Sequence, residues 1–412
     1  MKSKFKYLPS FSVGAFGDGL RRNVILKSKS GKEDLPIRFY SKDFPKKFRH
    51  NDFLVSAGHL LKHDPDCWNT MGFDENNFVM GDSGGYQICS GAMKWKDGIT
   101  PKVFDWLQKN ATVGMNLDIP PRLKYDGKFY DCLDLSSKNF KYFADNQDGQ
   151  TDYMNVIQGK DEYEFKTWYD EVKQYPFQGW AIGGSGFSYY KFLSGLMVLL
   201  EGKEHLNPNT KYIHILGTSR VTYFLLLLQL QKSFEEMGLD IVVTTDSSSP
   251  DRAVVFGTYY TGFSLKRGTW EAINFPNEKN HEEIVDDFLE LKNPKFPYVT
   301  EFDKMLSDYV DFTDIRQTTG TEGVYTYGMR LHNFEFFKDV LDRVETLVYG
   351  HNYLLEQSIN KDINQLMKFI DEMVKSDNPR YVFEKYKSLI TRMSNTNTSD
   401  NVNPDAGKFF GI

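Results

Sequence analysis

The stretch NFVMGDSGG, residues 77–85, sets the pattern on which the fold prediction rests. A short apolar run ends on the carboxylate of Asp82, and the small residues that follow favour a tight turn. Segments with helical apolar spacing follow such runs, and strands that alternate with helices indicate a parallel sheet. Six other segments have the same form: DFLVSAGHL (52–60), VGMNLDIPP (113–121), DYMNVIQGK (152–160), GWAIGGSG (179–186), KYIHILGTS (211–219) and DIVVTTDSSS (240–249).

The spacing of the strand ends narrows the fold class. The markers are Asp82, Asp118, Gln158, Gly183, Leu216 and Asp246. Successive markers lie 25 to 40 residues apart, which suits one strand and one helix each. An eighth strand is expected in FSVGAFGDG, residues 11–19. We therefore predict an α/β protein with a (β/α)8 TIM barrel, in which polar side chains at the carboxyl ends of the strands share one site.

Beyond residue 265 the pattern changes to helices. Four segments carry apolar residues three and four apart: NHEEIVDDFLELKN (280–293), NFEFFKDVLDRVETLVYGHNYLLEQSI (333–359), INQLMKFIDEMVKS (363–376) and RYVFEKYKSLITRM (380–393). We predict a barrel domain over 1–265, a helical extension packed on it over 266–392 and a flexible tail over 393–412. Within the barrel, Thr100 and Pro101 predict a helix cap followed by a proline at the first helical position.

The composition excludes several classes of protein. The chain has 412 residues, of which 40% are hydrophobic and 26% charged, as in soluble globular proteins. It contains no apolar run of about 18 residues, so no membrane span is expected. Three scattered cysteines, Cys67, Cys89 and Cys132, suit neither a disulfide framework nor a zinc site. We expect a reduced protein of the cytoplasm, or of the host cytoplasm if a phage encodes it.

The charge is unevenly distributed. The net charge is −6, but residues 1–50 contain 13 Lys and Arg against 4 Asp and Glu. A basic segment of this kind can bind phosphate groups locally, although a solvated surface has the same composition.

Two strand ends carry a carboxylate among small residues, Asp82 in GDSGG and Asp246 in TTDSSSPDR. Two facing carboxylates can carry out substitution at the anomeric carbon of a sugar. One attacks the carbon, and the other manages the proton on the leaving group. A simple turn at Asp82 and a serine-rich loop at Asp246 are the structural alternatives.

The remaining strand ends suggest the leaving group. Asp118 can accept hydrogen bonds from a ring N–H and an exocyclic amine, and Gln158 offers an amide. The backbone of residues 183–186 offers N–H donors, and Tyr86 and Leu216 can sandwich a flat ring. Together these groups are complementary to guanine.

These segments resemble the tRNA-guanine transglycosylase superfamily. MGDSGGYQ is similar to its DSGG-aromatic-Q motif, and SAGHLL to an early strand end. The segments TPKVFDWLQKNATVGMNLDIPP, NVIQGK, GWAIGGSG, YIHILGT, TTDSSSPDRA and YGMRLHNFEFFKDVLDRVETLV resemble later motifs. The motifs occur in family order over roughly residues 50 to 350.

The resemblance implies a role for each residue. Asp246 would be the nucleophile and Asp82 the general acid and base. The implied base-binding residues are Asp118, Gln158, Gly183, Gly184, Ser83, Leu216 and Tyr86, the last by stacking. Ser185 lies where the family senses the substituent at position 7 of the base.

The chain departs from the family at its structural zinc site. The family holds zinc with cysteines ahead of a histidine that matches His332, but PYVTEFDKMLSDYV contains no cysteine. We therefore expect no metal and no cofactor, and His332 is expected to be a packed or capping residue.

The simplified C-terminal region resembles a DNA-modifying branch found in phages and bacterial genomic islands. This implies a DNA-guanine transglycosylase, a pentosyltransferase that exchanges guanine in DNA for a 7-deazaguanine such as preQ0 through a covalent Asp–C1′ intermediate. The implied partners are DNA and the free base, with phosphate contacts from Arg252, Lys46, Lys47 and Arg49. A tRNA-guanine transglycosylase and an inactive nucleic-acid-binding barrel remain the alternatives, and homodimerisation or an accessory protein stays open.

Overall fold

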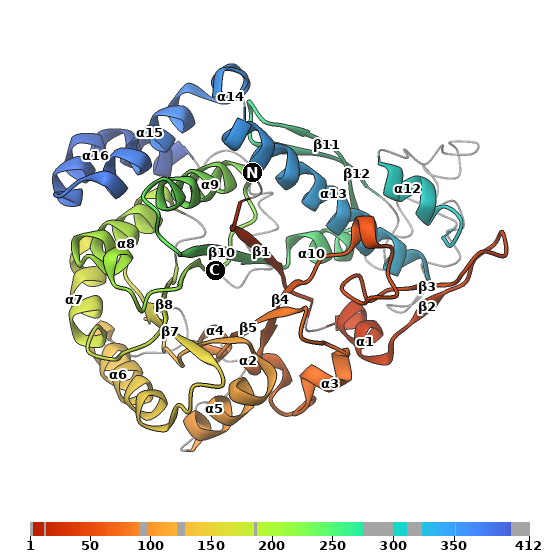
Figure 1. The fold of residues 1–412 in the computed structure, drawn as a ribbon, viewed down its shortest axis with the longest axis horizontal. Helices are drawn as coiled ribbons and strands as arrows, with labels where there is room; N and C mark the ends of the chain where they lie inside the picture. Colours follow the sequence, from red (N-terminus) through yellow and green to blue (C-terminus); the bar gives the residue numbers. More distant parts are fainter. Residues whose placement is uncertain are drawn as a thin grey trace.

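The computed structural model describes residues 3–11, 14–89, 98–121, 128–184, 188–274, 300–310, 324–350 and 352–396. Eight parallel strands form one sheet in the order β1-β10-β9-β8-β7-β6-β5-β4 (Figure 1). They are β1 (Lys6–Pro9), β4 (Asp52–Ser56), β5 (Phe78–Asp82), β6 (Val113–Met115), β7 (Asp152–Ile157), β8 (Gly179–Ile182), β9 (Tyr212–Ile215) and β10 (Val242–Ser247). A parallel bridge from Ser10 to Leu54 joins the two edges, so the sheet is a nearly closed barrel. The predicted (β/α)8 fold is confirmed.

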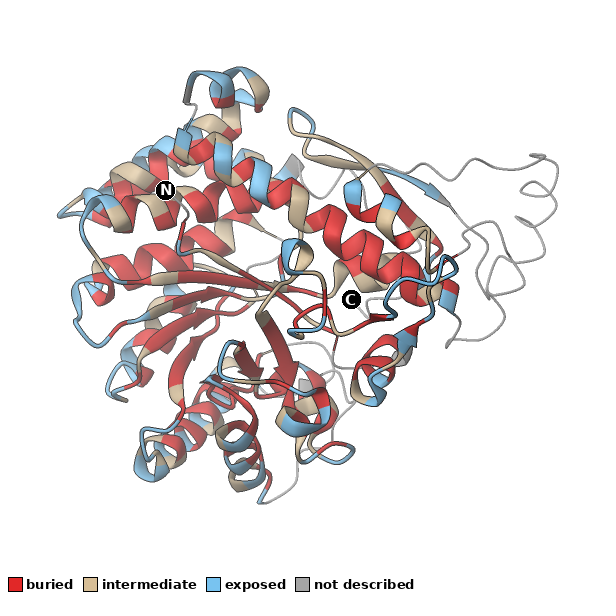
Figure 2. Cartoon of the chain, turned by 45° about the vertical axis from the view of Figure 1, so that its right-hand side comes forward, coloured by how far each residue is buried: buried red, intermediate tan, exposed pale blue. Residues whose placement is uncertain are grey.

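Helices surround this sheet. They are α1 (Gly14–Arg22), α2 (Ala57–Leu60), α3 (Cys67–Met71), α4 (Gly85–Cys89), α5 (Ile99–Asn110), α6 (Phe129–Asn146), α7 (Glu162–Val172), α8 (Tyr189–Glu201), α9 (Val221–Glu236) and α10 (Ser249–Val255). The strands and the inner faces of the helices are buried, while the outer faces of the helices are exposed (Figure 2). Because each strand is covered on both sides, strands such as DYMNVI are buried almost throughout.

The predictions for the first barrel strand and for the start of helix α5 are wrong. The first strand is Lys6–Pro9, and the stretch that was expected to supply it begins helix α1 at Gly14 instead. A Cβ on Gly19 would lie 2.7 Å from Cε1 of Tyr327, so this glycine lets α1 pack closely on a later helix. Helix α5 begins at Ile99 after Gly98, which has a φ of 78°, and the Thr100 hydroxyl donates to Asn139 at 2.8 Å rather than capping the helix.

The C-terminal region begins with a hairpin, which the sequence did not predict. Strands β11 (Thr258–Ser264) and β12 (Thr269–Asn274) pair in antiparallel fashion. Helices α12 (Glu301–Leu306), α13 (Val324–Gly350), α14 (Asn352–Ser358), α15 (Lys361–Lys375) and α16 (Pro379–Thr396) follow. Helix α16 extends into the predicted tail as far as Thr396. The predicted helix over 280–293 and the rest of the tail lie outside the described residues.

Helix α13 completes the ring of helices around the barrel. It packs against α9 and α10, and Phe337 contacts Tyr7 of β1 with 4.9 Å between ring centroids. The ring centroid of Phe334, in the same helix, lies 5.8 Å from that of Phe11. Helices α15 and α16 cover α9 and α8 from outside (Figure 1). The barrel and the C-terminal helices therefore share one hydrophobic core.

Three short elements lie at the periphery, the hairpin of β2 (Ile25–Leu26) and β3 (Leu35–Pro36) and the 3₁₀ helices η1 (Lys46–Phe48) and η2 (Glu204–Leu206). Among the described helices, none has the length and apolar character needed to cross a bilayer.

Candidate active site at the carboxyl ends of the strands

Asp82 ends strand β5 and is held by the neighbouring strand and by its own loop. Its Oδ2 accepts a hydrogen bond from the Ser56 hydroxyl at 2.6 Å, and its Oδ1 accepts one from the Gly84 N–H at 3.3 Å. Ser56 ends β4 and pairs in register with Asp82. Burial raises the pKa of the Asp82 carboxyl, the two hydrogen bonds oppose this rise, and the charge of Asp246 adds to it. Asp82 therefore holds its proton to higher pH than an exposed aspartate does.

Asp246 lies near the end of strand β10 and is held differently. Its Oδ1 accepts a hydrogen bond from the Gly217 N–H at 2.7 Å, and Nε2 of His214 lies 3.3 Å from the same oxygen. The Asp246 side chain is 15% exposed, so it is accessible to a ligand. Its charge is close enough to act on the pKa of Asp82. The two predicted carboxylates thus both lie at carboxyl ends of barrel strands, and they have different surroundings.

Asp118 and Gln158 form a buried pair beside the carboxylates. Gln158 Nε2 donates to Asp118 Oδ2 at 2.8 Å, and the two residues are 4% and 6% exposed. Glycines on both sides permit this packing. A Cβ on Gly183 would lie 2.0 Å from Gln158 Nε2, and a Cβ on Gly85 would lie 2.2 Å from the Asp118 carbonyl oxygen. The structure therefore brings together the ends of β6, β7 and β8 and the loop after Asp82.

The other predicted base-binding residues have varied positions. Ser83 is fully buried, and its hydroxyl donates to the Asn116 carbonyl at 3.2 Å, so it fastens the loop to the end of β6. Tyr86 on α4 is 49% exposed, and Leu216 is half-buried after β9. Gly184 has a φ of 67°, which favours glycine. Ser185 lies outside the described residues.

Several site residues were missed by the sequence analysis. Ser56 and His59 belong to the SAGHLL segment, and Nε2 of His59 lies 2.9 Å from Nε2 of Gln87. Burial lowers the pKa of His59, and the charge of Asp82 opposes this effect. His214 and Thr244 contact each other within neighbouring strands. The sequence could have indicated Thr244, because side chains alternate along β10 and Thr244 therefore lies on the same face as Asp246.

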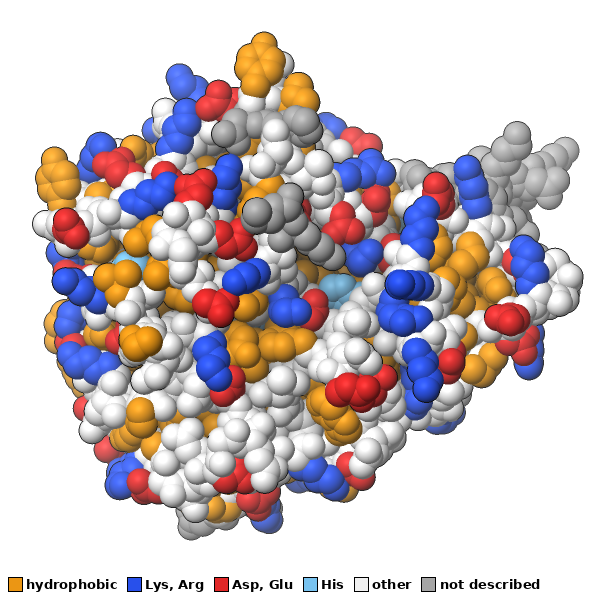
Figure 3. Space-filling model, in the orientation of Figure 1, with side chains coloured by type: hydrophobic (Ala, Val, Ile, Leu, Met, Phe, Trp, Pro, Cys, Tyr) orange, Lys and Arg blue, Asp and Glu red, His pale blue; other side chains and the backbone are white. Residues whose placement is uncertain are grey.

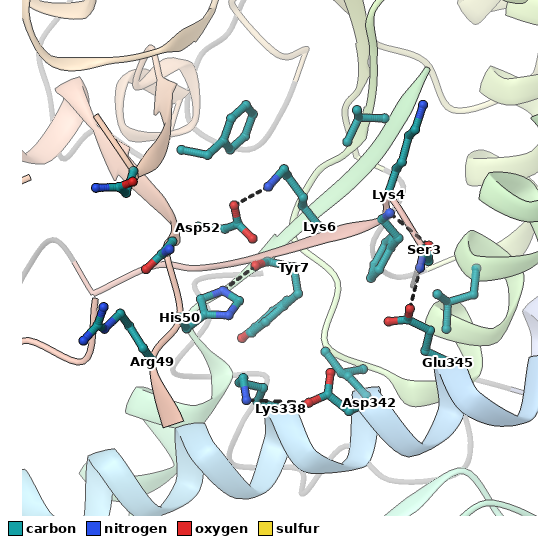
Figure 4. A pocket seen from close by; sticks show the side chains of 17 residues that line it. Ser3, Lys4, Lys6, Tyr7, Arg49, His50, Asp52, Lys338, Asp342 and Glu345 are labelled. Atoms are coloured by element: carbon teal, nitrogen blue, oxygen red, sulfur yellow. Dashed lines mark hydrogen bonds and ion pairs between the residues drawn. The ribbon is translucent and has the colours of Figure 1, made fainter. Parts of the chain in front are cut away.

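Of the residues predicted to contact phosphate, Arg49 lies away from the carboxyl-end site, and Lys46 and Lys47 lie in η1 just before it. Arg49 lines a cavity of about 490 Å³ whose other walls include Lys6, Asp52, Phe78 and Val242, the first residues of four barrel strands (Figure 4). This is the amino-terminal face, opposite to Asp82 and Asp246.

The segment is also engaged with the rest of the chain. An Arg49 guanidinium N–H donates to the Lys42 and Phe44 carbonyls, and Lys47 pairs with Glu301. Arg252, in contrast, lies on α10 directly after β10 and so belongs to the carboxyl-end face.

His332 is a packed residue, as expected. It is fully buried, its Nε2 donates to the Tyr260 carbonyl at 2.8 Å, and its Nδ1 contacts Asp303 and, at 2.8 Å, the Tyr259 hydroxyl. Both ring nitrogens are engaged with protein groups, so these residues do not fit the family's structural zinc. No group of three or more potential metal ligands occurs in the part of the chain that the structure describes.

No protein-family model and no curated protein matches this sequence.

Proposed function

We propose that the protein is a base-exchanging transglycosylase that replaces guanine in DNA with a 7-deazaguanine base. The observation that carries the proposal is the pair of carboxylates at the ends of β5 and β10, set in different surroundings beside the buried Asp118–Gln158 pair. An inactive barrel has no need for this combination. A plain glycoside hydrolase has no evident use for Asp118 and Gln158.

The reaction uses the two carboxylates in turn. Asp246 attacks C1′ of the nucleotide, and the electron pair of the glycosidic bond leaves with N9 of guanine. Asp82, whose pKa is raised by burial, donates the proton that the departing base requires. The incoming base then loses its N9 proton to Asp82 and attacks C1′, which releases the Asp246 carboxylate. Two displacements leave the configuration at C1′ unchanged.

Asp118 is suited to reading the base. The Gln158 hydrogen bond to Oδ2 fixes the carboxylate in a buried position. A carboxylate accepts hydrogen bonds from both N1–H and the 2-amine of guanine, and charge-assisted bonds of this kind are strong. Adenine presents a lone pair at N1, which a carboxylate repels. Guanine and 7-deazaguanine share the edge that Asp118 would contact.

The choice of DNA rests on the resemblance to the DNA-modifying branch. A guanine in a duplex must be flipped out, or be single-stranded, before C1′ becomes accessible. Arg252, on the same face as Asp246, is suited to hold a phosphate beside the reacting nucleotide.

The test is transfer of a labelled base. Purified protein is incubated with labelled guanine or preQ0 and, in matched reactions, with single-stranded DNA, duplex DNA and tRNA. We expect label in DNA and none with Asp246→Asn. Label in tRNA alone would replace the proposal with a tRNA-guanine transglycosylase, and no transfer to any polymer would favour an inactive nucleic-acid-binding barrel.

A further inference from the structure

His214 is a buried imidazole that contacts Asp246 from inside the barrel. It is 0% exposed and pairs in register with Thr244 on the neighbouring strand. Its Nδ1 lies 2.8 Å from the Thr244 hydroxyl oxygen, and its Nε2 lies 3.3 Å from Asp246 Oδ1. Thr244 and Asp246 are two residues apart on β10, so their side chains point to the same side of that strand. The imidazole therefore links the hydroxyl to the carboxylate.

The surroundings of the ring select one tautomer. A neutral imidazole has one N–H and one acceptor nitrogen. If the Thr244 hydroxyl donates to Nδ1, Nε2 carries the hydrogen and directs it toward the carboxylate. The other tautomer would set a lone pair of Nε2 against Asp246 Oδ1. Nε2 is buried and makes no hydrogen bond among the described residues, although Asp246 Oδ1 lies 3.3 Å away. Only the first arrangement turns a hydrogen toward this acceptor.

We propose that His214 is a positioning residue for the nucleophile, oriented by Thr244. This inference rests on the proposed base exchange. The Gly217 N–H binds Oδ1 and His214 Nε2 lies 3.3 Å from the same oxygen, which leaves Oδ2 as the atom that attacks C1′. Among the described residues, no hydrogen bond to Asp246 Oδ2 is present.

The two donors serve both halves of the reaction. As the C1′–Oδ2 bond forms and the C1′–N9 bond breaks, the electron pair goes to N9, and the base takes the proton of Asp82. Oδ1 becomes the carbonyl oxygen of the ester and keeps its donors. When the incoming base displaces Oδ2, the negative charge returns to the carboxylate, where the two donors stabilise it. The 3.3 Å contact is longer than a good hydrogen bond, and such contacts commonly shorten in the substrate complex.

The kinetic test separates positioning from binding and folding. His214→Leu removes the donor and should lower kcat by about 10²-fold, with little change in KM for the base because Asp118 and Gln158 are untouched. His214→Gln keeps an N–H donor, so its kcat should be about tenfold higher than that of His214→Leu. Thr244→Val should lower kcat by about tenfold, and Thr244→Ser should restore most of it.

His205→Gln is the matched control. His205 is also buried, at 6% exposed, but it lies in η2 and stacks on Phe234 at a distance of 6.4 Å between centroids. We expect it to exchange base as the wild type does. A purely structural role for His214 would instead raise KM and lower the melting temperature of His214→Leu without a selective loss of kcat.

A second measurement does not depend on activity. In protein labelled with ¹⁵N-histidine, the NMR signals of His214, assigned from their loss in His214→Gln, should show the Nε2–H tautomer in the absence of ligand. The Nδ1–H tautomer, or a His214→Leu variant with wild-type kcat, would overturn the inference while base exchange by the wild type would still support the proposed function. Failure of the wild type to exchange any base would reject the proposed function. The tautomer would then show only whether His214 directs its Nε2–H toward Asp246.

Discussion

Two aspartates of the same barrel mouth have surroundings that suit different tasks. Asp82 receives a hydroxyl donor from Ser56 and is buried enough to have a raised pKa. Asp246 receives the Gly217 backbone N–H on one oxygen and remains 15% exposed. Carboxylates in contrasting environments are a common basis for dividing acid and nucleophile roles within one site.

The raised pKa of Asp82 predicts a pH-dependent cost in stability. The carboxyl has a higher pKa in the folded protein than the ordinary 3.8, so the folded state binds more protons than the unfolded state between these two values. Stability therefore falls as pH rises through this window and stays lower above it. Asp82→Asn removes the effect, and the Ser56 hydroxyl can accept from the new amide.

Thermal unfolding at about pH 4.5 and about pH 7.5 tests this prediction. Asp82→Asn should gain more in melting temperature over the wild type at the higher pH, while base exchange is lost. An equal difference at both pH values would show that Asp82 does not carry this cost.

Asp118 should determine the choice of base. Asp118→Asn keeps an oxygen that accepts from Gln158, so the pair and the fold should survive. Its amide cannot accept from both guanine donors, and a buried mismatch of this kind costs about 10⁴-fold in kcat/KM. Steady-state exchange of guanine measures the loss, and circular dichroism checks the fold. A variant that exchanges guanine within a few-fold of the wild type would remove Asp118 from the site.

At the scale of the elements, glycines let the strand ends approach one another. Gly183→Ala would place a methyl group 2.0 Å from Gln158 Nε2 and so displace that side chain from Asp118. We expect a loss of about 1–3 kcal/mol in the free energy of unfolding and weaker binding of the base.

Gly350→Ala is the control, because no described atom outside the adjacent turn of its own helix lies within 4 Å of the added methyl group and alanine is the better helix former. Chemical denaturation and base titration should show no loss for Gly350→Ala. Equal effects of the two substitutions would contradict the account of the strand ends.

The structure also explains which elements could be predicted from the sequence. Seven barrel strands were predictable because a parallel strand buried on both faces is apolar over its whole length. Strand β1 was missed because part of its cover comes from Phe337 of α13, far along the chain. The hairpin of β11 and β12 was missed for a similar reason, since Trp270 packs on Phe337 at 5.0 Å between ring centroids.

The sequence also predicted the site residues at the strand ends, but not those inside the barrel. The topology of a barrel gathers Asp82, Asp118, Gln158 and Asp246 because all four lie at carboxyl ends of strands. The ring of His214 lies inside the barrel, where no turn or charge marks it. Basic composition around Arg49 indicated phosphate binding, but composition does not say at which end of a strand a side chain lies.

At the scale of the whole molecule, positive and negative side chains are mixed across the face seen in Figure 3 rather than gathered into one basic patch. On the proposed function, nucleic-acid binding should depend on particular residues of the carboxyl-end face, where Asp246 and Arg252 lie. Arg252→Ala should weaken DNA binding and reduce its salt dependence by about one phosphate contact.

Charge reversal at Lys46 and Lys47 is the control, since both lie in η1, ahead of the amino end of β4. DNA binding by these variants should match the wild type when measured by fluorescence anisotropy over a range of salt concentrations. If the lysine variants lose more DNA affinity than Arg252→Ala, the nucleic acid does not bind at the carboxyl-end face, and the assignment of Arg252 is contradicted.

The most direct test of the central claim is detection of the covalent intermediate. A guanine-containing DNA oligonucleotide is incubated with the protein without free base, the mixture is denatured, and the adduct is mapped by peptide mass spectrometry. We predict an oligonucleotide linked through C1′ to Asp246, which disappears when guanine or preQ0 is added before denaturation. The Asp246→Asn protein should form no such adduct. Base exchange by the wild type with no adduct, or with an adduct on another residue, would contradict the role assigned to Asp246.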